Sequence, residues 1–512
     1  MRRTSIFPLL LIFLLLAYAA EAKDRKDKTA LAKRIESLLA QPDVARGFWG
    51  IKIVDEATGR VLYEHDADRL FTPASNTKLV TTAAAFALVG PQHIFRTTLE
   101  TNGVLDSHGR VTGDLVLVGR GDPNLSGRTL PYAGKTERAK TPDYYLQELT
   151  DQVVARGVKV IDGDIVGDDS YYAFERYATT WDEGDLMWES GAPVSALSLN
   201  DNVLFLSVGP GDRVGDRALL TMAPFADYYD FENKITTTAA GTGGRNLGAH
   251  REPGSKRLML WGSIPQGDSG VVEALAIDDP AEFSAQLLRQ KLEAKGVMIF
   301  GKTRVKHAER NTLGIVPVST SSLPGTMTVL AEHTSPPLGD DLKVINKVSQ
   351  NLHVELALRL IGHEKLGTGS FDAGLQAERS FLALAGITAD ECRLYDGSGM
   401  SDKDLMSPSA FIKLLQYAHA QSWGAQFEDT LPIGGVDGTL MNRFTDQAHA
   451  TRVHAKTGTH RQANTLSGYA TTKKGNRIVF SVMSNNHLLG TQRAQQVIDA
   501  IVTAAIDDTG KK

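Results

Sequence analysis

A serine and a lysine stand three residues apart at the start of an apolar run, where they could form a nucleophile and its base. Ser75 and Lys78 lie in PASNTKLVTTAAAFALVG, residues 73–90. We expect a helix there, opened by Pro73, in which positions i and i+3 share one face. A serine hydroxyl needs a base within hydrogen-bond reach, and a lysine amine serves only if its pKa is lowered. The pair therefore predicts either a nucleophilic site or a cap beside a solvated side chain.

Two further sets of polar residues follow along the chain. Ser349, Gln350 and Asn351 begin SQNLHVELALRLIG, where a loop or helix end presents a hydroxyl and an amide. The stretch 456–459 reads Lys-Thr-Gly-Thr and precedes a predicted pair of strands. Each set alone is weak, because Ser-x-Asn is often a turn or cap and Lys-Thr-Gly an ordinary strand end. Their occurrence together in this order favours chemistry.

The three sets resemble the Ser-x-x-Lys, Ser-Asp-Asn and Lys-Thr-Gly motifs of penicillin-binding proteins and class A β-lactamases. The chain is most similar to class C low-molecular-mass penicillin-binding proteins, the D-alanyl-D-alanine carboxypeptidase/endopeptidase (serine peptidase S13) family that trims peptidoglycan. The gap of about 270 residues between Ser75 and Ser349 is also typical of that family, and a β-lactamase has no room for it. Further similar blocks are GDLVLVGRGDPNLS from Gly113, APVSALSLNDN from Ala192, DGSGMS from Asp396 and LPIGGVDGTL from Leu431.

The resemblance implies a serine peptidase mechanism. Ser75 would attack the carbonyl of the D-Ala-D-Ala bond while neutral Lys78 takes its proton, which gives an acyl-enzyme that water later releases. Ser349 would relay a proton to the leaving amine, and Asn351 would hold Lys78 and the substrate amide. The backbone N–H groups of Ser75 and Thr459 would bind the oxyanion. A penicillin would acylate Ser75 as a substrate mimic.

The same resemblance assigns substrate binding to the Lys-Thr-Gly-Thr set. Lys456 would lower the pKa of Lys78 through its positive field and would attract the terminal carboxylate of the substrate. Thr457 and Thr459 would donate hydroxyl hydrogen bonds to that carboxylate. Gly458 has no Cβ, so the substrate backbone could approach the strand edge and add to it as an extra strand.

Three further residues carry weaker signals. Gln350 stands where the family usually has Asp, but the middle residue mainly braces the loop, so we expect activity to survive. His353 is expected on a helix surface or in the core. Asp185, in TTWDEGDLMWESGAP, matches a family carboxylate that would attract the free amine of the peptide's diamino acid. The alternative is that Asp185 belongs to a solvated acidic loop.

The elements that must position these residues change character along the chain. The chain begins with a helix, a hairpin and the Ser75 helix. Its middle contains short strands and two amphipathic helices, each of which is followed by Gly-Val and a β-rich run. Its last part contains helices and a final pair of strands. We expect the opening hairpin and the late strands in one sheet. The predicted fold is α/β (α+β), a penicillin-binding/serine β-lactamase-like antiparallel sheet flanked by helices, with inserted domains of which the innermost is mostly β. The expected domains are a discontinuous DD-peptidase domain of residues 23–96 and 325–512, an inserted α/β domain of residues 97–199 and 271–324, and a nested insert of residues 200–270.

The N-terminus reads MRRTSIFPLLLIFLLLAYAAEAK, a pattern typical of a cleaved secretory signal peptide over residues 1–22. Cleavage is expected after Ala22 or Ala19. An uncleaved anchor is disfavoured, because the apolar run is shorter than the roughly 20 residues of a spanning helix. The expected location is therefore the periplasm, with membrane association at most peripheral.

Composition excludes several classes of function. The 512 residues exceed one core, so two or three domains are expected. A formal net charge of −5 without a basic block argues against a nucleic-acid partner. The single Cys392 cannot form an internal disulfide and is expected to be buried. No His-Glu-x-x-His or paired-Cys pattern occurs, so we expect no metal and no cofactor.

Two alternatives to the peptidase stay open from the sequence alone. A β-lactamase needs fast deacylation and a carboxylate for the second water, and no extra motif supplies one. The second alternative is a non-catalytic peptidoglycan-binding scaffold, in which Gln350 would indicate that catalytic activity has been lost. The expected partners of the peptidase are peptidoglycan stem peptides, with β-lactams as covalent inhibitors. Carboxypeptidase and endopeptidase action break the same kind of bond, so the sequence does not separate them.

Overall fold

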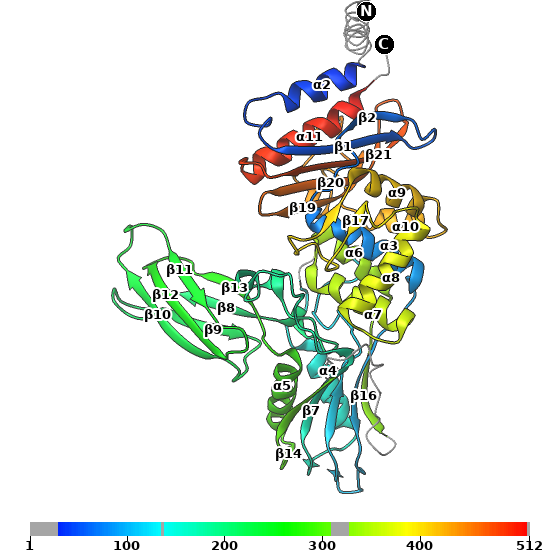
Figure 1. Ribbon diagram of the computed structural model, residues 1–512. Helices are drawn as coiled ribbons and strands as arrows, with labels where there is room; N and C mark the ends of the chain where they lie inside the picture. Colours follow the sequence, from blue (N-terminus) through cyan, green and yellow to red (C-terminus); the bar gives the residue numbers. More distant parts are fainter. Residues whose placement is uncertain (1–28, 135–137, 309–326, 509–512) are drawn as a thin grey trace, which may run out of the picture.

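The computed structural model describes residues 29–134, 138–308 and 327–508. The expected signal peptide, residues 1–22, lies outside the described residues. Figure 1 shows a sheet with helices on both faces, a second sheet beyond those helices, and a group of strands that projects to one side. Within the described ranges, no helix combines the length and the apolar character that crossing a membrane requires.

The first sheet unites the two ends of the chain. Its strand order is β19-β20-β21-β1-β2, and all neighbours are antiparallel. Strand β1 pairs with β21 along its whole length, so the expected union of the opening hairpin with the late strands is confirmed. Strand β19 lies at the edge of the sheet. The strands are β1 (Phe48–Asp55), β2 (Val61–His65), β19 (Val453–His460), β20 (Ala463–Thr471) and β21 (Arg477–Asn485).

Helices cover both faces of this sheet (Figure 1). Helices α2 and α11 share one core with the sheet, and a larger helical layer lies on the opposite face. Helix α3 runs through that layer and is buried almost all round, because its small Ala and Thr side chains let neighbouring helices approach closely. The helices are α2 (Ala30–Leu39), α3 (Lys78–Leu88), α6 (Leu338–Val348), α7 (Asn351–Leu366), α8 (Phe371–Leu384), α9 (Pro408–His419), α10 (Gly424–Asp429) and α11 (Thr491–Asp507).

Local sequence explains where several of these helices begin. The hydroxyl of Ser370 accepts the N–H of Ala373 at the start of α8, and Ser407 caps α9 in the same way at Ala410. Pro408 follows in the first turn of α9, where a missing N–H costs nothing. Between α8 and α9 the chain makes a two-stranded ribbon of β17 (Cys392–Arg393) and β18 (Leu405–Met406).

The second sheet has the order β15-β7-β5-β3-β16. Strand β7 is parallel to β5 and β15, whereas β3 is antiparallel to β5 and β16. The short strands after α4 and α5 pair in parallel, and β7 and β15 continue them, so the two similar helix-to-strand units predicted from the sequence lie side by side. The elements are β3 (Arg96–Thr101), β4 (Arg110–Val111), β5 (Leu115–Val118), α4 (Tyr144–Ala155), β6 (Val160–Ile161), β7 (Ile165–Ala173), α5 (Pro280–Ala294), β14 (Met298–Ile299), β15 (Thr303–Ala308) and β16 (Thr328–Thr334).

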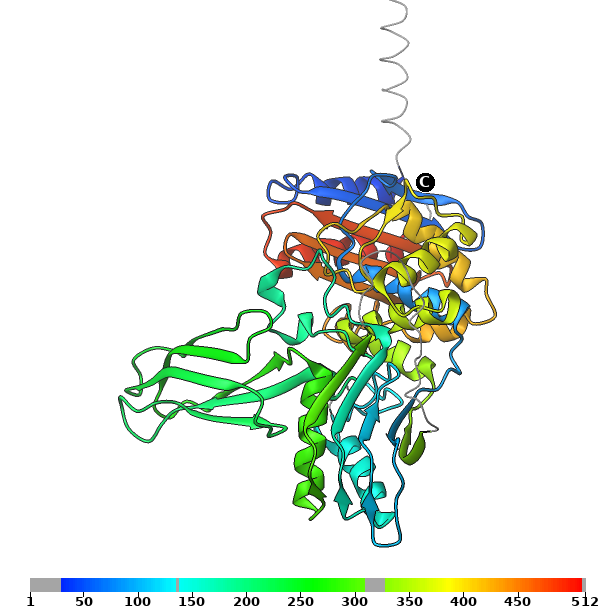
Figure 2. The ribbon, with the colours of Figure 1, turned by 60° about the horizontal axis from the view of Figure 1, so that its bottom comes forward.

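The projecting strands form two further sheets of three strands each, with orders β13-β8-β9 and β10-β12-β11 (Figures 1 and 2). The innermost insert is therefore mostly β, as predicted. The domain limits stay a prediction; strand β16, which follows the expected limit at residue 324, pairs with β3 of the second sheet. The strands are β8 (Val203–Gly209), β9 (Leu219–Ala223), β10 (Asp230–Thr238), β11 (Asn246–His250), β12 (Arg257–Pro265) and β13 (Val271–Ala276).

Candidate active site

Ser75 lies in a short 3-10 turn, η1 (Ala74–Thr77), that leads directly into α3. The prediction of a single helix that begins at Pro73 is therefore wrong for its first turn. The reason is local: Ala74 has a φ of +48°, a left-handed conformation that costs a residue with a Cβ roughly 1 to 2 kcal/mol and interrupts a helix. Gly399 packs against this turn, since a Cβ there would lie 1.9 Å from the Ala74 carbonyl oxygen. The strained turn is therefore fixed from outside.

The amine of Lys78 connects the Ser75 hydroxyl to two further groups. Nζ lies 2.9 Å from Ser75 Oγ, 2.7 Å from Asn351 Oδ1 and 2.8 Å from the carbonyl oxygen of Ser398. A neutral amine has two N–H donors and one lone pair. Asn351 and Ser398 present only acceptor oxygens here, so they take the two donors and leave the lone pair for the Ser75 proton. These contacts suit a lysine that acts as a base.

Burial lowers the pKa of Lys78 to about 7, although the carboxylates of Asp396 and Glu355 oppose this change. Lys456 is also fully buried, and burial followed by repulsion from Lys78 holds its pKa well below the ordinary value. The sequence interpretation gave burial or a second cation as the cause of a lowered Lys78 pKa, and named Lys456 as that cation. The structure assigns the lowered pKa of Lys78 to burial, because α3 places the amine inside the helical layer.

The Ser349-Gln350-Asn351 set lies at a break between α6 and α7. Ser349 ends α6 with a φ of +63°, so the chain turns sharply before α7 begins. Gln350 is the N-cap of α7, and its side-chain oxygen accepts the N–H of His353 at 3.3 Å. This is the capping task that Asp performs well, and the amide oxygen of Gln350 performs it here.

Asn351 contacts two parts of the chain at once. Its Oδ1 accepts from Lys78, and its Nδ2 donates to the carbonyl oxygen of Ser190 at 2.8 Å. Ser190 lies in the short helix η3 (Glu189–Gly191), in the inserted part of the chain. The amide orientation is therefore fixed from the side opposite the lysine.

Strand β19 brings the Lys-Thr-Gly-Thr set to the same place. Lys456 Nζ donates to Ser349 Oγ at 2.9 Å, so the second amine touches the second serine. Thr457 Oγ1 donates to Thr439 Oγ1 at 2.8 Å, on the short helix η5 (Gly438–Leu440). The hydroxyl oxygen of Thr459 accepts from Asn464 at 3.1 Å, which leaves its own proton available for a ligand.

Gly458 is required by packing inside the protein. A Cβ at this position would lie 2.2 Å from Thr465 Oγ1, 2.8 Å from the Pro73 carbonyl oxygen and 3.1 Å from Ser75 N. The missing side chain thus lets β19 lie directly against the turn that carries Ser75. The sequence interpretation related this glycine to the approach of substrate, whereas the structure gives it a role in placing Ser75.

Asp185 is not joined by a hydrogen bond to the Ser75 group within the described residues. It lies in η2 (Glu183–Asp185), and its Oδ2 is buried without a hydrogen-bond partner. The segment around it contacts the first part of the molecule: Asp182 pairs with Arg461 at 3.0 Å, just after β19, and Trp181 Nε1 donates to Asp396 at 2.8 Å. Asp185 is therefore beside the site and not among its central contacts.

Two contributors to the site were missed by the sequence analysis. Ser398 accepts a hydrogen bond from Lys78, and Glu355 accepts the N–H groups of Gly397 and Ser398 at 3.0 and 2.8 Å. The available signal was an acidic residue on the apolar face of the predicted helix after Asn351. His353, in the same helix, is buried. Among the described residues, no group of three or more His, Cys, Asp or Glu could hold a metal ion.

An antiparallel sheet with helices on both faces and a Ser75–Lys78 contact at the head of the central helix place the protein in the class of penicillin-binding and serine β-lactamase-like proteins. Residues 31–507 match the D-Ala-D-Ala carboxypeptidase 3 (S13) family. The chain therefore belongs to this family of serine D-Ala-D-Ala carboxypeptidases, and the resemblance inferred from its motifs is confirmed.

Comparison with known proteins extends over most of the chain. The D-alanyl-D-alanine carboxypeptidase of Actinomadura sp. (strain R39) is 32% identical over 470 residues, which are 90% of this chain and 81% of that protein. The D-alanyl-D-alanine carboxypeptidase DacB of Haemophilus influenzae is 24% identical over 440 residues, 84% of each protein. The crystal structure of penicillin binding protein 4 from the same organism superposes with a TM-score of 0.78 at 22% identity, covering 92% of this chain and 98% of that one. The fold is shared over nearly the whole length.

Proposed function

We propose that the protein removes the terminal D-Ala of peptidoglycan stem peptides through an acyl-enzyme on Ser75. Neutral Lys78 takes the hydroxyl proton as Ser75 attacks the peptide carbonyl, and Ser349 relays a proton to the leaving amine of D-Ala. Water then attacks the ester and releases the shortened peptide. The observation that carries this proposal is the 2.9 Å contact between Ser75 Oγ and a buried amine whose pKa is about 7.

The two buried amines give substrate binding a part in activation. The charged amines of Lys78 and Lys456 repel each other, so protonation of one lysine disfavours protonation of the other. The carboxylate of a terminal D-Ala beside Lys456 favours the charged form of Lys456. The proton is then held less well by Lys78, which becomes the neutral base when substrate is bound. In this proposal the free carboxylate both anchors the substrate and prepares the nucleophile.

Residues of β19 and the α7 start hold the rest of the peptide. Thr457 and Thr459 donate hydroxyl hydrogen bonds to the terminal carboxylate, and Asn351 donates to a substrate amide. The backbone N–H groups of Ser75 and Thr459 bind the oxyanion, each worth about 3 kcal/mol. The edge position of β19 supports addition of the substrate backbone as an extra strand next to Gly458.

Release of D-Ala from a pentapeptide tests the proposal. The purified protein is expected to release D-Ala, and Ser75→Ala is expected to release none above background while retaining the same thermal transition. Absence of release from the unchanged protein would favour a peptidoglycan-binding scaffold. A cross-linked peptide dimer as a second substrate measures endopeptidase action, which uses the same bond chemistry.

Labelling with a fluorescent penicillin separates the peptidase from a β-lactamase. The label is expected to be attached to Ser75. It is expected to persist for minutes, because slow deacylation makes a penicillin an inhibitor. Label loss within seconds would favour the lactamase. Among the described residues, the Ser75 hydroxyl has its hydrogen bond with Lys78 and none with a carboxylate that could activate a second water, which supports slow release.

The substrate also bears on location and organisation. We propose export by residues 1–22 and action in the periplasm, because the N-terminal pattern is that of a signal peptide and stem peptides lie outside the cytoplasm. We further propose that residues 23–96 and 325–512, except for β16, which pairs with β3 of the second sheet, form the DD-peptidase domain, interrupted by the inserted and nested domains. N-terminal sequencing of protein recovered from the periplasm, expected to begin at Lys23 or Ala20, tests the export.

A further inference from the structure

Helix α7 reaches the amine of Lys78 in two ways. Its first residue, Asn351, accepts a hydrogen bond from the amine at 2.7 Å. Glu355 lies one helical turn further along and accepts the backbone N–H groups of Gly397 and Ser398 at 3.0 and 2.8 Å. The carbonyl oxygen of Ser398 in turn accepts from Lys78 Nζ at 2.8 Å. Two of the three oxygens around the amine are therefore held by one helix, one directly and one through a loop.

Glu355 is fully buried, and its charge is not explained by the hydrogen bonds that it accepts. Both bonds go to Oε1, and Oε2 has no hydrogen-bond partner among the described residues. Arg359, one turn further along α7, pairs with Glu175 at 3.9 Å. A neutral side chain could accept the same two N–H groups at a smaller desolvation cost. The carboxylate itself therefore requires a reason.

The groups around Glu355 show what its charge acts on. Burial raises the pKa of Glu355 to about 7, Asp396 adds to this effect, and Arg359 opposes it. Above that pH the carboxyl is charged while Lys78 is neutral. The ionisable groups that face Glu355 are Lys78 of α3, Arg359 of α7, Glu378 of α8, and Asp396 and Asp404 of the segment after β17.

We propose that Glu355 is a positioning residue for acylation, which holds the carbonyl oxygen of Ser398 on Lys78 and supplies a negative charge for the ammonium that forms there. The inference rests on the proposed function, because it concerns the same step. As Ser75 Oγ bonds to the substrate carbonyl carbon, its proton moves to Lys78 Nζ. The ammonium and the buried carboxylate attract each other, whereas the neutral amine gains little from the charge. The attraction is therefore stronger in the transition state than in the ground state, and it speeds acylation.

The pH profile of acylation in Glu355→Gln tests this role. Gln keeps an acceptor oxygen for the two N–H groups and removes the charge. Protonation of Lys78 is then less favoured, so the midpoint of the benzylpenicillin acylation profile is expected to move to lower pH by roughly half a pH unit or more. The rate above the midpoint is expected to fall about tenfold, because the ammonium loses its counter-charge. A loss of stability alone would lower the fraction of active protein and leave the midpoint unchanged.

Glu355→Ala separates the hydrogen bonds from the charge. Ala removes the acceptor as well, so acylation is expected to be about tenfold slower than in Glu355→Gln across the profile, because the Ser398 carbonyl is no longer held. Thermal unfolding identifies a variant that does not fold. Equal rates in the folded Gln and Ala variants would show that the acceptor positions nothing, and would overturn the proposal.

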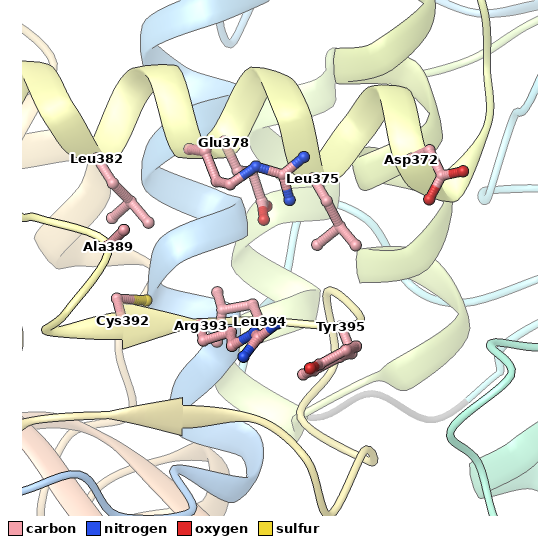
Figure 3. Close-up of a pocket in the computed structure, with 10 residues that line it drawn as sticks. Asp372, Leu375, Glu378, Leu382, Ala389, Cys392, Arg393, Leu394 and Tyr395 are labelled. Carbon is pink, nitrogen blue, oxygen red and sulfur yellow. The ribbon is translucent and has the colours of Figure 1, made fainter. Parts of the chain in front are cut away.

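Glu378→Gln is the matched control. Glu378 is another buried acid, and it lies on α8 beside a cavity between that helix and residues 389–395 (Figure 3). Cys392, buried as expected from the sequence, lies on the opposite wall of the cavity. Burial raises the pKa of Glu378 to about 8, so its carboxyl is neutral around the midpoint of the profile. Its replacement is therefore expected to leave the midpoint unchanged.

The outcomes separate this role from the proposed function. If benzylpenicillin acylates the unchanged protein and Glu355→Gln has the same midpoint, the role of Glu355 is refuted and the proposed function stands. An equal shift in Glu378→Gln would refute it as well. An unchanged protein that benzylpenicillin does not acylate would contradict the proposed function itself, and the role of Glu355 with it.

Discussion

Lys78 and Lys456 are the residues on which the proposed chemistry depends, because both amines are buried and both have lowered pKa values. Lys78 has three oxygen contacts, which match three N–H donors when it is charged and two donors with one lone pair when it is neutral. The site can therefore hold either charge state without rearrangement. With a pKa of about 7, the change between them falls at physiological pH.

The rate constant for acylation of Ser75 by benzylpenicillin is expected to rise with pH up to about 7 and to level off above it. Only neutral Lys78 accepts the hydroxyl proton, and below its pKa each pH unit lowers the neutral fraction about tenfold. Stopped-flow measurements between about pH 5 and pH 9 give the profile. Circular dichroism at each pH controls for unfolding. A rate that stays constant down to about pH 5 would exclude Lys78 as the base.

Residue types and spacing predicted the contacts of Ser75 with Lys78, since one helical turn relates them. They did not predict the groups behind Lys78. Ser398 contributes its backbone carbonyl, which does not depend on the type of its side chain. Glu355 accepts backbone N–H groups of a loop about 40 residues further along the chain. Such contacts depend on packing between segments and leave no mark on local sequence.

Strand β19 and the turn η1 form the first unit at the scale of elements. Gly458→Ala is expected to slow acylation by at least about a hundredfold, because the new Cβ would overlap Thr465 Oγ1 and crowd the backbone at Pro73, which displaces the nucleophile. Fluorescent-penicillin labelling measures the rate. Gly475→Ala, in the turn between β20 and β21, is the matched control: no atom lies within 4 Å of the added Cβ, so any effect arises from its φ of +85° alone. Equal rates in the two variants would refute the displacement.

The second unit is a buried charge cluster that fastens the α6–α7 break to the inserted part. His353 Nδ1 lies 2.6 Å from Asp341 and Nε2 lies 3.0 Å from Asp201, and Arg128 donates to Asp201 at 2.9 Å. Burial lowers the pKa of His353, but Asp341 and Asp201 outweigh it and raise the value to about 9. Asp201 is held in a left-handed conformation with φ of +55°, which Asp tolerates better than most residues. The cluster therefore fixes Ser349 and Asn351 indirectly, through α7.

Asp201→Asn is expected to destabilise the protein by about 3 to 5 kcal/mol, because it leaves the buried Arg128 without its anion and removes one of the two carboxylates that face His353. The same stabilisation should depend on pH. It is fully present below the unfolded His353 pKa of 6.5 and is lost as the pH rises through about 9. Thermal unfolding across this range measures it, with the exposed Asp212→Asn as control. A melting temperature equal to that of the control would show that the cluster stabilises nothing.

The Ser349-Gln350-Asn351 set predicted a loop or helix end, and the break between α6 and α7 lies there. Helix periodicity alone did not show it, because DDLKVINKVSQNLHVELALRLIG has a continuous helical pattern. The left-handed Ser349 is held by Lys456, which lies 107 residues away in sequence. The contact between Ser349 and Lys456 forms only when β19 joins the sheet, so the sequence around Ser349 does not predict it.

At the scale of the whole molecule, a segment of about ten residues brings the inserted part to the Ser75 site. Trp181 contacts Asp396, Asp182 pairs with Arg461, and Ser190 accepts from Asn351. The order of elements predicted that both chain ends build one sheet, because complementary strands remain at the two ends. The order of elements did not place the inserted segment beside the site, but the family resemblance of TTWDEGDLMWESGAP did; the individual side-chain pairs across the two parts are decided only in the folded chain.

That segment also carries Asp185, whose Oδ2 is buried without a partner. Asp185→Ala is expected to lower kcat/KM about tenfold or more for a stem peptide with a free side-chain amine, and to leave penicillin acylation unchanged, because benzylpenicillin carries no such amine. The same peptide with its amine acetylated supplies the control within one experiment: unchanged protein and variant should then hydrolyse it equally. A loss that is the same for free and acetylated peptides would mean that Asp185 only supports the segment, and substrate selection by the inserted part would have to rest on other residues.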